Sequence, residues 1–216
     1  LFRSGPELMG SVADNSFNLG IFLGGNNVYT TGETFIVFDV QDIENPQLIS
    51  EIEIPGTEYG VAMQNNTAFV MDSEFFFYRS ECRDDVIIIN CENVEDPEVL
   101  GTFGATGMIH DVGVSEGIAY LACMQNGLKI INVINPEQPE ELATIETEDK
   151  AFAIDISGEL LFVAEYEAGL RIYNIEDPNN LAELGSLDTP GRAKDVVVVG
   201  EFAYLADGAE GFRVID

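Results

Sequence analysis

The chain has few of the residues that most catalytic and metal-binding sites require. Its 216 residues include a single histidine, His110, with three cysteines and no tryptophan. It contains neither a CxxC pair nor a G-x-S-x-G motif, which argues against a structural zinc site and against the nucleophile elbow of an α/β-hydrolase. The sequence therefore predicts a protein that is not an enzyme and has no cofactor, with calcium as the one ion left open.

Basic residues are also scarce, and long apolar runs are absent. Nine Lys and Arg stand against 39 Asp and Glu, which gives a formal net charge of −30. A chain of this charge repels a phosphate backbone, so nucleic acid is excluded as a partner. The acids are scattered, which fits either a solvated surface or the attraction of cations. Without an apolar run of about twenty residues, direct membrane insertion is not expected.

One short apolar pattern recurs at a regular spacing. It has the form [Leu/Phe/Val]-x-[Ile/Val]-x-[Asp/Asn] and occurs at residues 35–39, 86–90, 128–132, 170–174 and 212–216. The first interval is 51 residues and the other three are 42 residues each. A fixed period of this size is typical of solenoids and propellers.

Each repeat contains three further short runs. In the best repeats the first run lies at 111–115, 153–157 and 195–199, and the second at 119–122, 161–164 and 203–206. The recurring pattern is the third run, and the fourth lies at 98–103, 140–145 and 182–187. All are rich in Val, Ile, Leu, Tyr and Phe and are bounded by turn residues, which predicts strands. Four antiparallel strands per repeat of ~40 residues predict an all-β fold, a β-propeller of four-stranded blades.

The repeat also resembles a known family. The combination of DVxVxG, AYLA, GLRIxN/D and a following Asn/Asp-Pro turn is similar to the LVIVD-repeat family, over essentially the whole chain and most closely over 109–216. The resemblance implies a β-propeller of the kind common in secreted and cell-surface prokaryotic proteins. It therefore implies an extracellular or cell-surface module. Asn often replaces the final Asp of the motif here, and the first two repeats are irregular.

We expect residues 1–216 to form a single propeller domain. Its segments are about 1–14, 15–55, 56–108, 109–150, 151–192 and 193–216. Residues 6–12 match a fourth strand, so the chain holds four full blades and a split fifth. Two alternatives stay open. Either residues 6–12 pair with 212–216 and close a five-bladed ring, or the chain is a fragment of a larger propeller.

The strongest candidate binding site lies on the face that carries the turns between second and third strands. The second repeat is nine residues longer than its successors, and the excess lies within residues 72–85. Aromatic and arginine side chains there are typical of a recognition surface for a protein or carbohydrate partner. The predicted binding residues are Phe76, Tyr78, Arg79 and Arg83, with Glu165 and Tyr166 from the corresponding turn of the fourth repeat. Alternatively, the adjoining strands are longer and their aromatics pack on the next blade.

A second candidate site is the rim of the central axis, where the first strands begin. Asn18, Asp111 and Asp195 occupy aligned positions there, and His110 is adjacent. Oxygen ligands suit calcium, so a calcium-binding or hydrolase- or lyase-type propeller is the alternative function. In the competing interpretation the aspartates accept hydrogen bonds from backbone N–H groups.

The cysteines do not form a disulfide framework. Cys82 and Cys91 flank one strand and are separated by ~30 Å at ~3.3 Å per residue, too far for a bridge. Cys82 and Cys123 lie near turns of adjacent blades, so this pair can form a bridge or stay reduced.

Overall fold

The computed structural model describes residues 11–12, 20–54, 58–72 and 83–216. These residues form five antiparallel sheets, one for each repeat, and contain no α-helix. Among them, no helix is long and apolar enough to cross a membrane. The pairing of residues 6–12 with 212–216 involves residues outside the described part.

The strands of each sheet are adjacent in chain order. The first sheet holds β1 (Gly20–Gly24), β2 (Asn27–Thr31), β3 (Thr34–Asp39) and β4 (Gln47–Glu53). The second holds β5 (Glu58–Gln64), β6 (Thr67–Asp72), β7 (Arg83–Asn90) and β8 (Glu98–Thr106). The third holds β9 (Asp111–Ser115), β10 (Ile118–Ala122), β11 (Leu128–Asn132) and β12 (Glu140–Ile145). The fourth holds β13 (Ala153–Ser157), β14 (Leu160–Ala164), β15 (Leu170–Asn174) and β16 (Ala182–Leu187). The fifth holds β17 (Asp195–Val199), β18 (Phe202–Ala206) and β19 (Phe212–Ile215), with the short 3-10 helix η1 (Gly208–Glu210) before β19.

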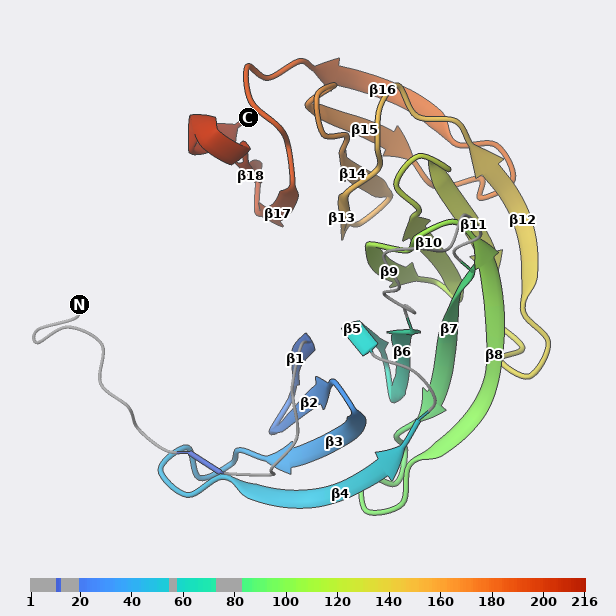
Figure 1. Cartoon of the computed structure of the whole chain (residues 1–216), viewed down its shortest axis with the longest axis vertical. Helices are drawn as coiled ribbons and strands as arrows, with labels where there is room; N and C mark the ends of the chain where they lie inside the picture. Colours follow the sequence, from blue (N-terminus) through green and yellow to red (C-terminus); the bar gives the residue numbers. More distant parts are fainter. Residues whose placement is uncertain (1–10, 13–19, 55–57, 73–82) are drawn as a thin grey trace, which may run out of the picture.

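The five sheets are arranged as blades around a common axis (Figure 1). The first strands β1, β5, β9, β13 and β17 lie innermost, and the first strands of consecutive sheets contact each other. The fourth strands form the outer side of the arc, which begins at the first sheet and ends at the fifth. The predicted β-propeller fold is confirmed.

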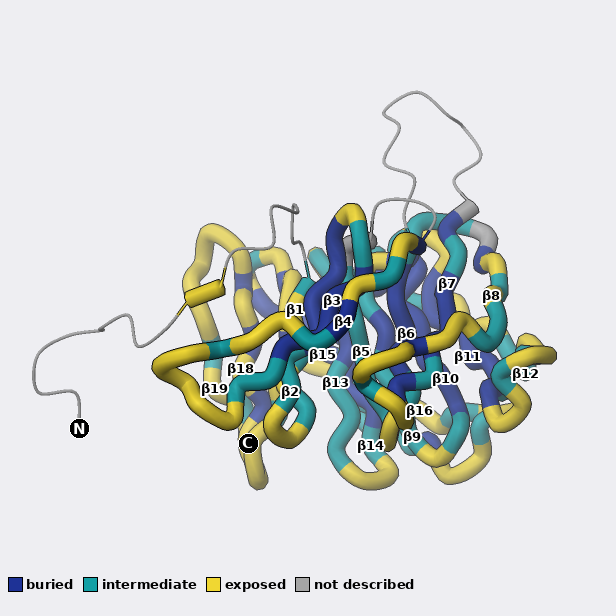
Figure 2. Tube along the Cα trace, turned by 90° about the horizontal axis from the view of Figure 1, so that it is seen from below, coloured by how far each residue is buried: buried dark blue, intermediate teal, exposed yellow. Residues whose placement is uncertain are grey.

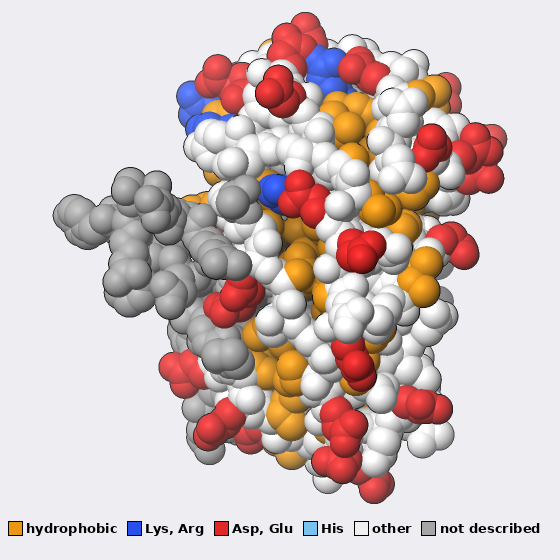
Figure 3. Space-filling model, turned by 90° about the vertical axis from the view of Figure 1, so that its right-hand side faces the viewer, with side chains coloured by type: hydrophobic (Ala, Val, Ile, Leu, Met, Phe, Trp, Pro, Cys, Tyr) orange, Lys and Arg blue, Asp and Glu red, His pale blue; other side chains and the backbone are white. Residues whose placement is uncertain are grey.

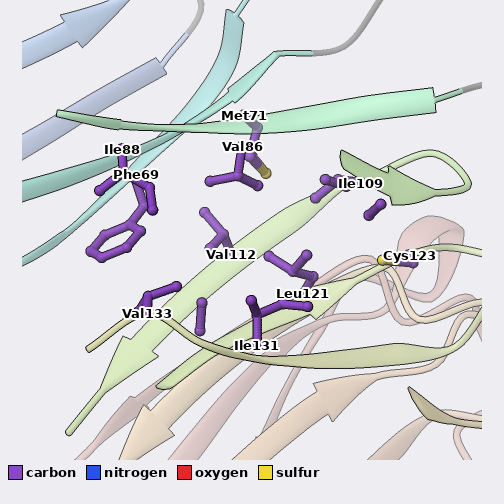
Figure 4. Close-up of a cluster of buried hydrophobic side chains, with 12 residues drawn as sticks. Phe69, Met71, Val86, Ile88, Ile109, Val112, Leu121, Cys123, Ile131 and Val133 are labelled. Atoms are coloured by element: carbon purple, nitrogen blue, oxygen red, sulfur yellow. The ribbon is translucent and has the colours of Figure 1, made fainter. Parts of the chain in front are cut away.

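The hydrophobic core consists of separate clusters, each between two consecutive sheets. Between the second and third sheets, Val86 and Ile88 of β7 face Leu121 of β10 and Ile131 of β11 (Figure 4). The intervening residue Ile87 belongs to the cluster on the other side of the same sheet. Third strands are therefore apolar at nearly every position because both of their faces are covered by neighbouring sheets.

The fifth sheet, at the end of the arc, shows the opposite case. Figure 2 shows the fifth sheet largely exposed, whereas β6, β7 and β10 are buried. Phe212 and Val214 of β19 are 72% and 54% exposed, although the equivalent Leu128 and Ile130 of the third sheet are 0% exposed. Coverage by the next sheet, rather than the residue type, decides the burial of these positions.

The recurring Asn or Asp at the end of each third strand has a local role. Its side-chain Oδ1 accepts a hydrogen bond from the backbone N–H two residues later, in Asp39 to Gln41 at 2.7 Å and in Asn132 to Ile134 at 3.0 Å. Asn90 and Asn174 do the same. Both residue types carry the required acceptor oxygen, which explains why Asn replaces Asp in the motif.

Acidic side chains are distributed over the surface rather than gathered in one tail. On the side of the molecule shown in Figure 3 they are scattered among apolar and polar groups, and basic side chains are few. Cys91 and Cys123 are buried free thiols, so Cys123 forms no bridge in this structure, and Cys82 lies outside the described residues.

Candidate binding site

The turn between β14 and β15 has an unusual backbone conformation. Its sequence is EYEAG, and Tyr166 has a φ of 44° in the left-handed region. A bulky residue with positive φ is a rare conformation that the surrounding structure must hold in place. Here Tyr166 exchanges two backbone hydrogen bonds with Ala193, of 3.1 and 2.8 Å, which ties the turn to the segment before β17. The equivalent positions in the neighbouring repeats are Met124 and Gly208, also with positive φ.

Three aromatic rings meet at this turn. The Tyr166 ring stacks on Phe152 with centroids 5.6 Å apart and an interplanar angle of 16°. Phe152 in turn contacts His110, with ring centroids 4.0 Å apart. Phe152 and His110 immediately precede the innermost strands β13 and β9, so the rings lie at the inner rim of the propeller.

Three cations surround these rings. The Nζ of Lys150 lies 4.8 Å from the Tyr166 ring centroid, and the guanidinium carbon of Arg192 lies 5.2 Å from it. The Nζ of Lys194 lies 6.0 Å from the centroid of Phe152. All three distances are within the range of cation–π attraction. We call this group of six residues the rim cluster: His110, Lys150, Phe152, Tyr166, Arg192 and Lys194.

The other basic side chains that the structure describes have a different role. They occupy the second position of the third strands in repeats three to five, and each forms an ion pair with an acid of its own sheet. The pairs are Lys129 with Glu141, Arg171 with Glu165 and Arg213 with Asp207, at 2.8, 2.9 and 2.6 Å. Among residues 84–216, every basic side chain outside these strand positions therefore belongs to the rim cluster.

A pocket of about 640 Å³ lies beside the rim cluster. Arg192 and Lys194 line it together with Glu167 and Glu210. The guanidinium of Arg192 is 3.3 Å from the carboxylate of Glu167, but both side chains are more than half exposed. An exposed pair of this kind contributes only about 0–1 kcal/mol, so Arg192 remains free to exchange Glu167 for another anion.

Three other hollows differ from this pocket in kind. They have volumes of 520 to 550 Å³ and lie on the opposite face, between the turns of consecutive sheets. Each hollow is lined by turns that join the first and second strands of a sheet. The turn Gly24–Asn27 lines one hollow, and Glu116, from the equivalent turn of the third repeat, lines the other two. They follow from the repeat geometry itself, whereas the pocket at the rim cluster is lined by residues of the fourth and fifth repeats, between Glu167 and Glu210.

Glu165, a predicted binding residue, is placed inside the blade. Its side chain is 0% exposed and accepts hydrogen bonds from Arg171 Nε at 2.9 Å and from the Tyr173 hydroxyl at 3.2 Å. It also accepts a 3.0 Å hydrogen bond from the backbone N–H of Glu148. Glu165 therefore offers no surface to a partner and instead fixes the turn that carries Tyr166. Arg171 also pairs with Glu148 and Glu183, and the sequence alone did not single it out.

Asp111, predicted at the axial rim, uses both carboxylate oxygens in the fold. It accepts hydrogen bonds of 2.8 Å from its neighbour Val112 N and from Ile154 N of the next sheet. This arrangement matches the interpretation in which an aspartate binds backbone N–H groups. Asp195 is exposed at the start of β17, and Asn18 lies outside the described residues. In the part of the chain that the structure describes, no three His, Cys, Asp or Glu side chains are placed to hold a metal ion, so the calcium site stays a prediction.

Most of the predicted insertion site lies outside the described residues. This applies to Phe76, Tyr78 and Arg79, which fall within 73–82. Arg83 is the first residue of β7, which therefore begins three residues before the recurring pattern at 86–90. Part of the extra length thus belongs to a strand, as the alternative interpretation expected.

The carboxylates of Asp111, which is half-buried, and of Glu165, which is buried, predict a pH dependence of stability. Burial raises the pKa of Asp111 and of Glu165 to about 7, above their ordinary values of 3.8 and 4.5. Between about pH 4 and pH 7 the folded chain therefore holds protons that the unfolded chain has released. Stability must fall as the pH rises through this window and level off above it. We expect a higher melting temperature at pH 5.5 than at pH 8 in a calorimetric scan, and a smaller difference for Asp111→Asn. An equal or higher melting temperature at pH 8 would contradict this.

Comparison with known families agrees with the repeat architecture. The LVIVD repeat matches residues 106–147, 149–189 and 190–216, together just over half of the chain. The chain belongs to the LVIVD repeat family. All six residues of the rim cluster lie within the matched LVIVD repeats, at positions just before a first strand or just after a second strand.

Solved structures show the same fold for these LVIVD repeats. The computationally designed Ika4 protein superimposes with a TM-score of 0.60, at 14% sequence identity, over 80% of this chain and 99% of that one. At this identity the likeness concerns the fold alone. No curated protein sequence matches the chain.

Proposed function

We propose that the chain is a non-catalytic binding module of an extracellular or cell-surface protein. Its partner, a protein or a carbohydrate, binds at the rim cluster and the adjoining pocket. The observation that carries this proposal is the strained turn of Tyr166, which holds an aromatic ring in contact with two cations beside a pocket of about 640 Å³. Rare backbone conformations of this kind gather at ligand sites, where they are maintained by the rest of the structure.

The rim cluster is well suited to binding because it is already organised. The ring of Tyr166 is fixed by its stacking on Phe152 and by the backbone bonds to Ala193. Glu165, directly before it, is fixed by the buried contact with Arg171. A partner therefore meets the stacked rings of Tyr166 and Phe152 in a fixed position, which reduces the entropic cost of association.

Substitution of Tyr166 by glycine provides a selective test. Glycine tolerates the positive φ and is the natural residue at the equivalent position 208, so Tyr166→Gly removes the ring without straining the turn. The matched control is Met124→Gly, the same change in the turn between β10 and β11. Binding would be measured on an array of oligosaccharides and peptides, with melting temperatures recorded for all three proteins.

We expect Tyr166→Gly to lose at least about tenfold in affinity for the bound probes, equal to about 1.4 kcal/mol. Met124→Gly should bind as the unchanged chain does, and all three proteins should stay folded. Equal binding by the two variants would overturn the proposed site. Binding of no probe by the unchanged chain would count against the function itself.

A further inference from the structure

We infer that the ligand of the rim cluster is an acidic saccharide, whose carboxylate is bound by Arg192 and Lys194. This inference rests on the proposed function and specifies its ligand. On a chain of net charge −30, an anion is repelled from most of the surface, so an anionic ligand needs a local site of opposite charge.

The rim cluster is such a site because its cations are not neutralised inside the protein. The strand residues Lys129, Arg171 and Arg213 are paired with acids of their own sheets. Within the described residues, Lys150 and Lys194 form no ion pair, and Arg192 has only its exposed pair with Glu167. Three cations thus remain available next to one pocket.

The geometry keeps these cations close together. Lys150 and Arg192 both lie over the ring of Tyr166, and Lys194 lies over Phe152, which stacks on that same ring. Cations gathered at one pair of rings repel one another, and the negative faces of the rings offset part of that cost. A carboxylate bound in the pocket that Arg192 and Lys194 line would offset it further.

The remaining lining of the pocket favours a saccharide over an acidic peptide. Glu167 and Glu210 contribute carboxylates, which accept hydrogen bonds from hydroxyl groups. Apart from the stems of the charged side chains, the apolar lining is limited to Pro190 and Ala209. A polyhydroxylated ring with one carboxylate can use both kinds of charged group, whereas an acidic peptide side chain has no hydroxyl to offer the two glutamates.

The test compares trigalacturonate with its methyl ester, which has the same size and hydroxyl groups but no charge. Isothermal titration would be carried out with the unchanged chain and with the double variant Arg192→Ala, Lys194→Ala. Both substitutions together make the chain more negative by two charges. The charge-matched control is Asn135→Asp, Gln138→Glu, two exposed positions in the turn between β11 and β12 on the opposite face.

We expect the unchanged chain and the charge-matched control to bind the acid at least about tenfold more tightly than the ester. The double variant should lose that preference.

Equal binding of acid and ester would overturn the acidic-ligand inference and leave the pocket as a binding site for neutral saccharides. Tighter binding of a polyglutamate peptide than of trigalacturonate would overturn the saccharide assignment. A loss of preference in the control as well would assign the effect to overall charge and not to Arg192 and Lys194. If neither saccharide binds, the inference is overturned.

Discussion

Replacing Arg171 by alanine should destabilise the fourth blade by about 3–5 kcal/mol at pH 8, because it leaves the buried carboxylate of Glu165 without its cation. Glu165 is 0% exposed and Arg171 only 11%, so water cannot replace the missing partner. Arg171 also lies against Glu148 and Glu183, which would then repel one another. We expect a lower midpoint in a urea titration, with the unfolding slope unchanged.

The exposed ion pair of Arg192 with Glu167 provides the matched control for Arg171→Ala. Arg192→Ala removes an arginine from a pair in which both side chains are more than half exposed, and should cost about 0–1 kcal/mol. The cost of Arg171→Ala should also shrink at pH 5.5, because Glu165 can then take up a proton in place of its cation. Similar losses for the two arginines would show that the contact of Arg171 with Glu165 is not the stabilising element described here.

Gly169→Ala should destabilise the chain by about 2–5 kcal/mol, which combines left-handed strain with overpacking. Gly169 has a φ of 78°, and a Cβ there would lie 2.2 Å from the carbonyl oxygen of Leu187 and 2.8 Å from Thr189 N. Both contacts are with backbone at the end of β16 and just after it, which cannot move without disturbing the pairing of β15 with β16.

A second glycine separates the two contributions. Gly158 also has a positive φ, of 62°, but a Cβ there would meet nothing within 4 Å. Gly158→Ala should therefore cost only the conformational strain, about 1–2 kcal/mol. Chemical denaturation of both variants measures the difference directly. Equal costs for the two glycines would mean that the turn before β15 relaxes, and that close packing does not explain why glycine precedes the third strand.

Much of the fold follows from the sequence because the repeat is in register. Runs predicted at 111–115, 153–157 and 195–199 coincide with β9, β13 and β17, since turn residues fix both ends of each strand. The irregular second repeat was harder to predict. There β7 begins at Arg83 and β8 continues to Thr106, beyond the runs that the hydrophobic pattern marked, because long strands can extend into polar sequence when they pair with each other.

The candidate site was only partly predictable. Tyr166 was singled out from its turn and His110 from its position, but nothing in either stretch shows that their rings meet through Phe152. The repeat itself does contain a signal for the cations of this site: Lys150 and Arg192 are 42 residues apart and therefore occupy equivalent positions in consecutive repeats. Glu165 could not be recognised as buried, because its environment depends on Arg171 six residues later and on Glu148 of the preceding turn.

The most direct test of this account is a map of ligand contacts on the folded 23.6 kDa chain. Amide chemical shifts would be followed by NMR while trigalacturonate is added to the unchanged chain. We expect the largest changes at Phe152, Tyr166 and Lys194, with further changes at Gly208 and Glu210 on the far side of the pocket. Changes concentrated instead at the turns of the opposite face, around Glu116 and Gly158, would contradict it.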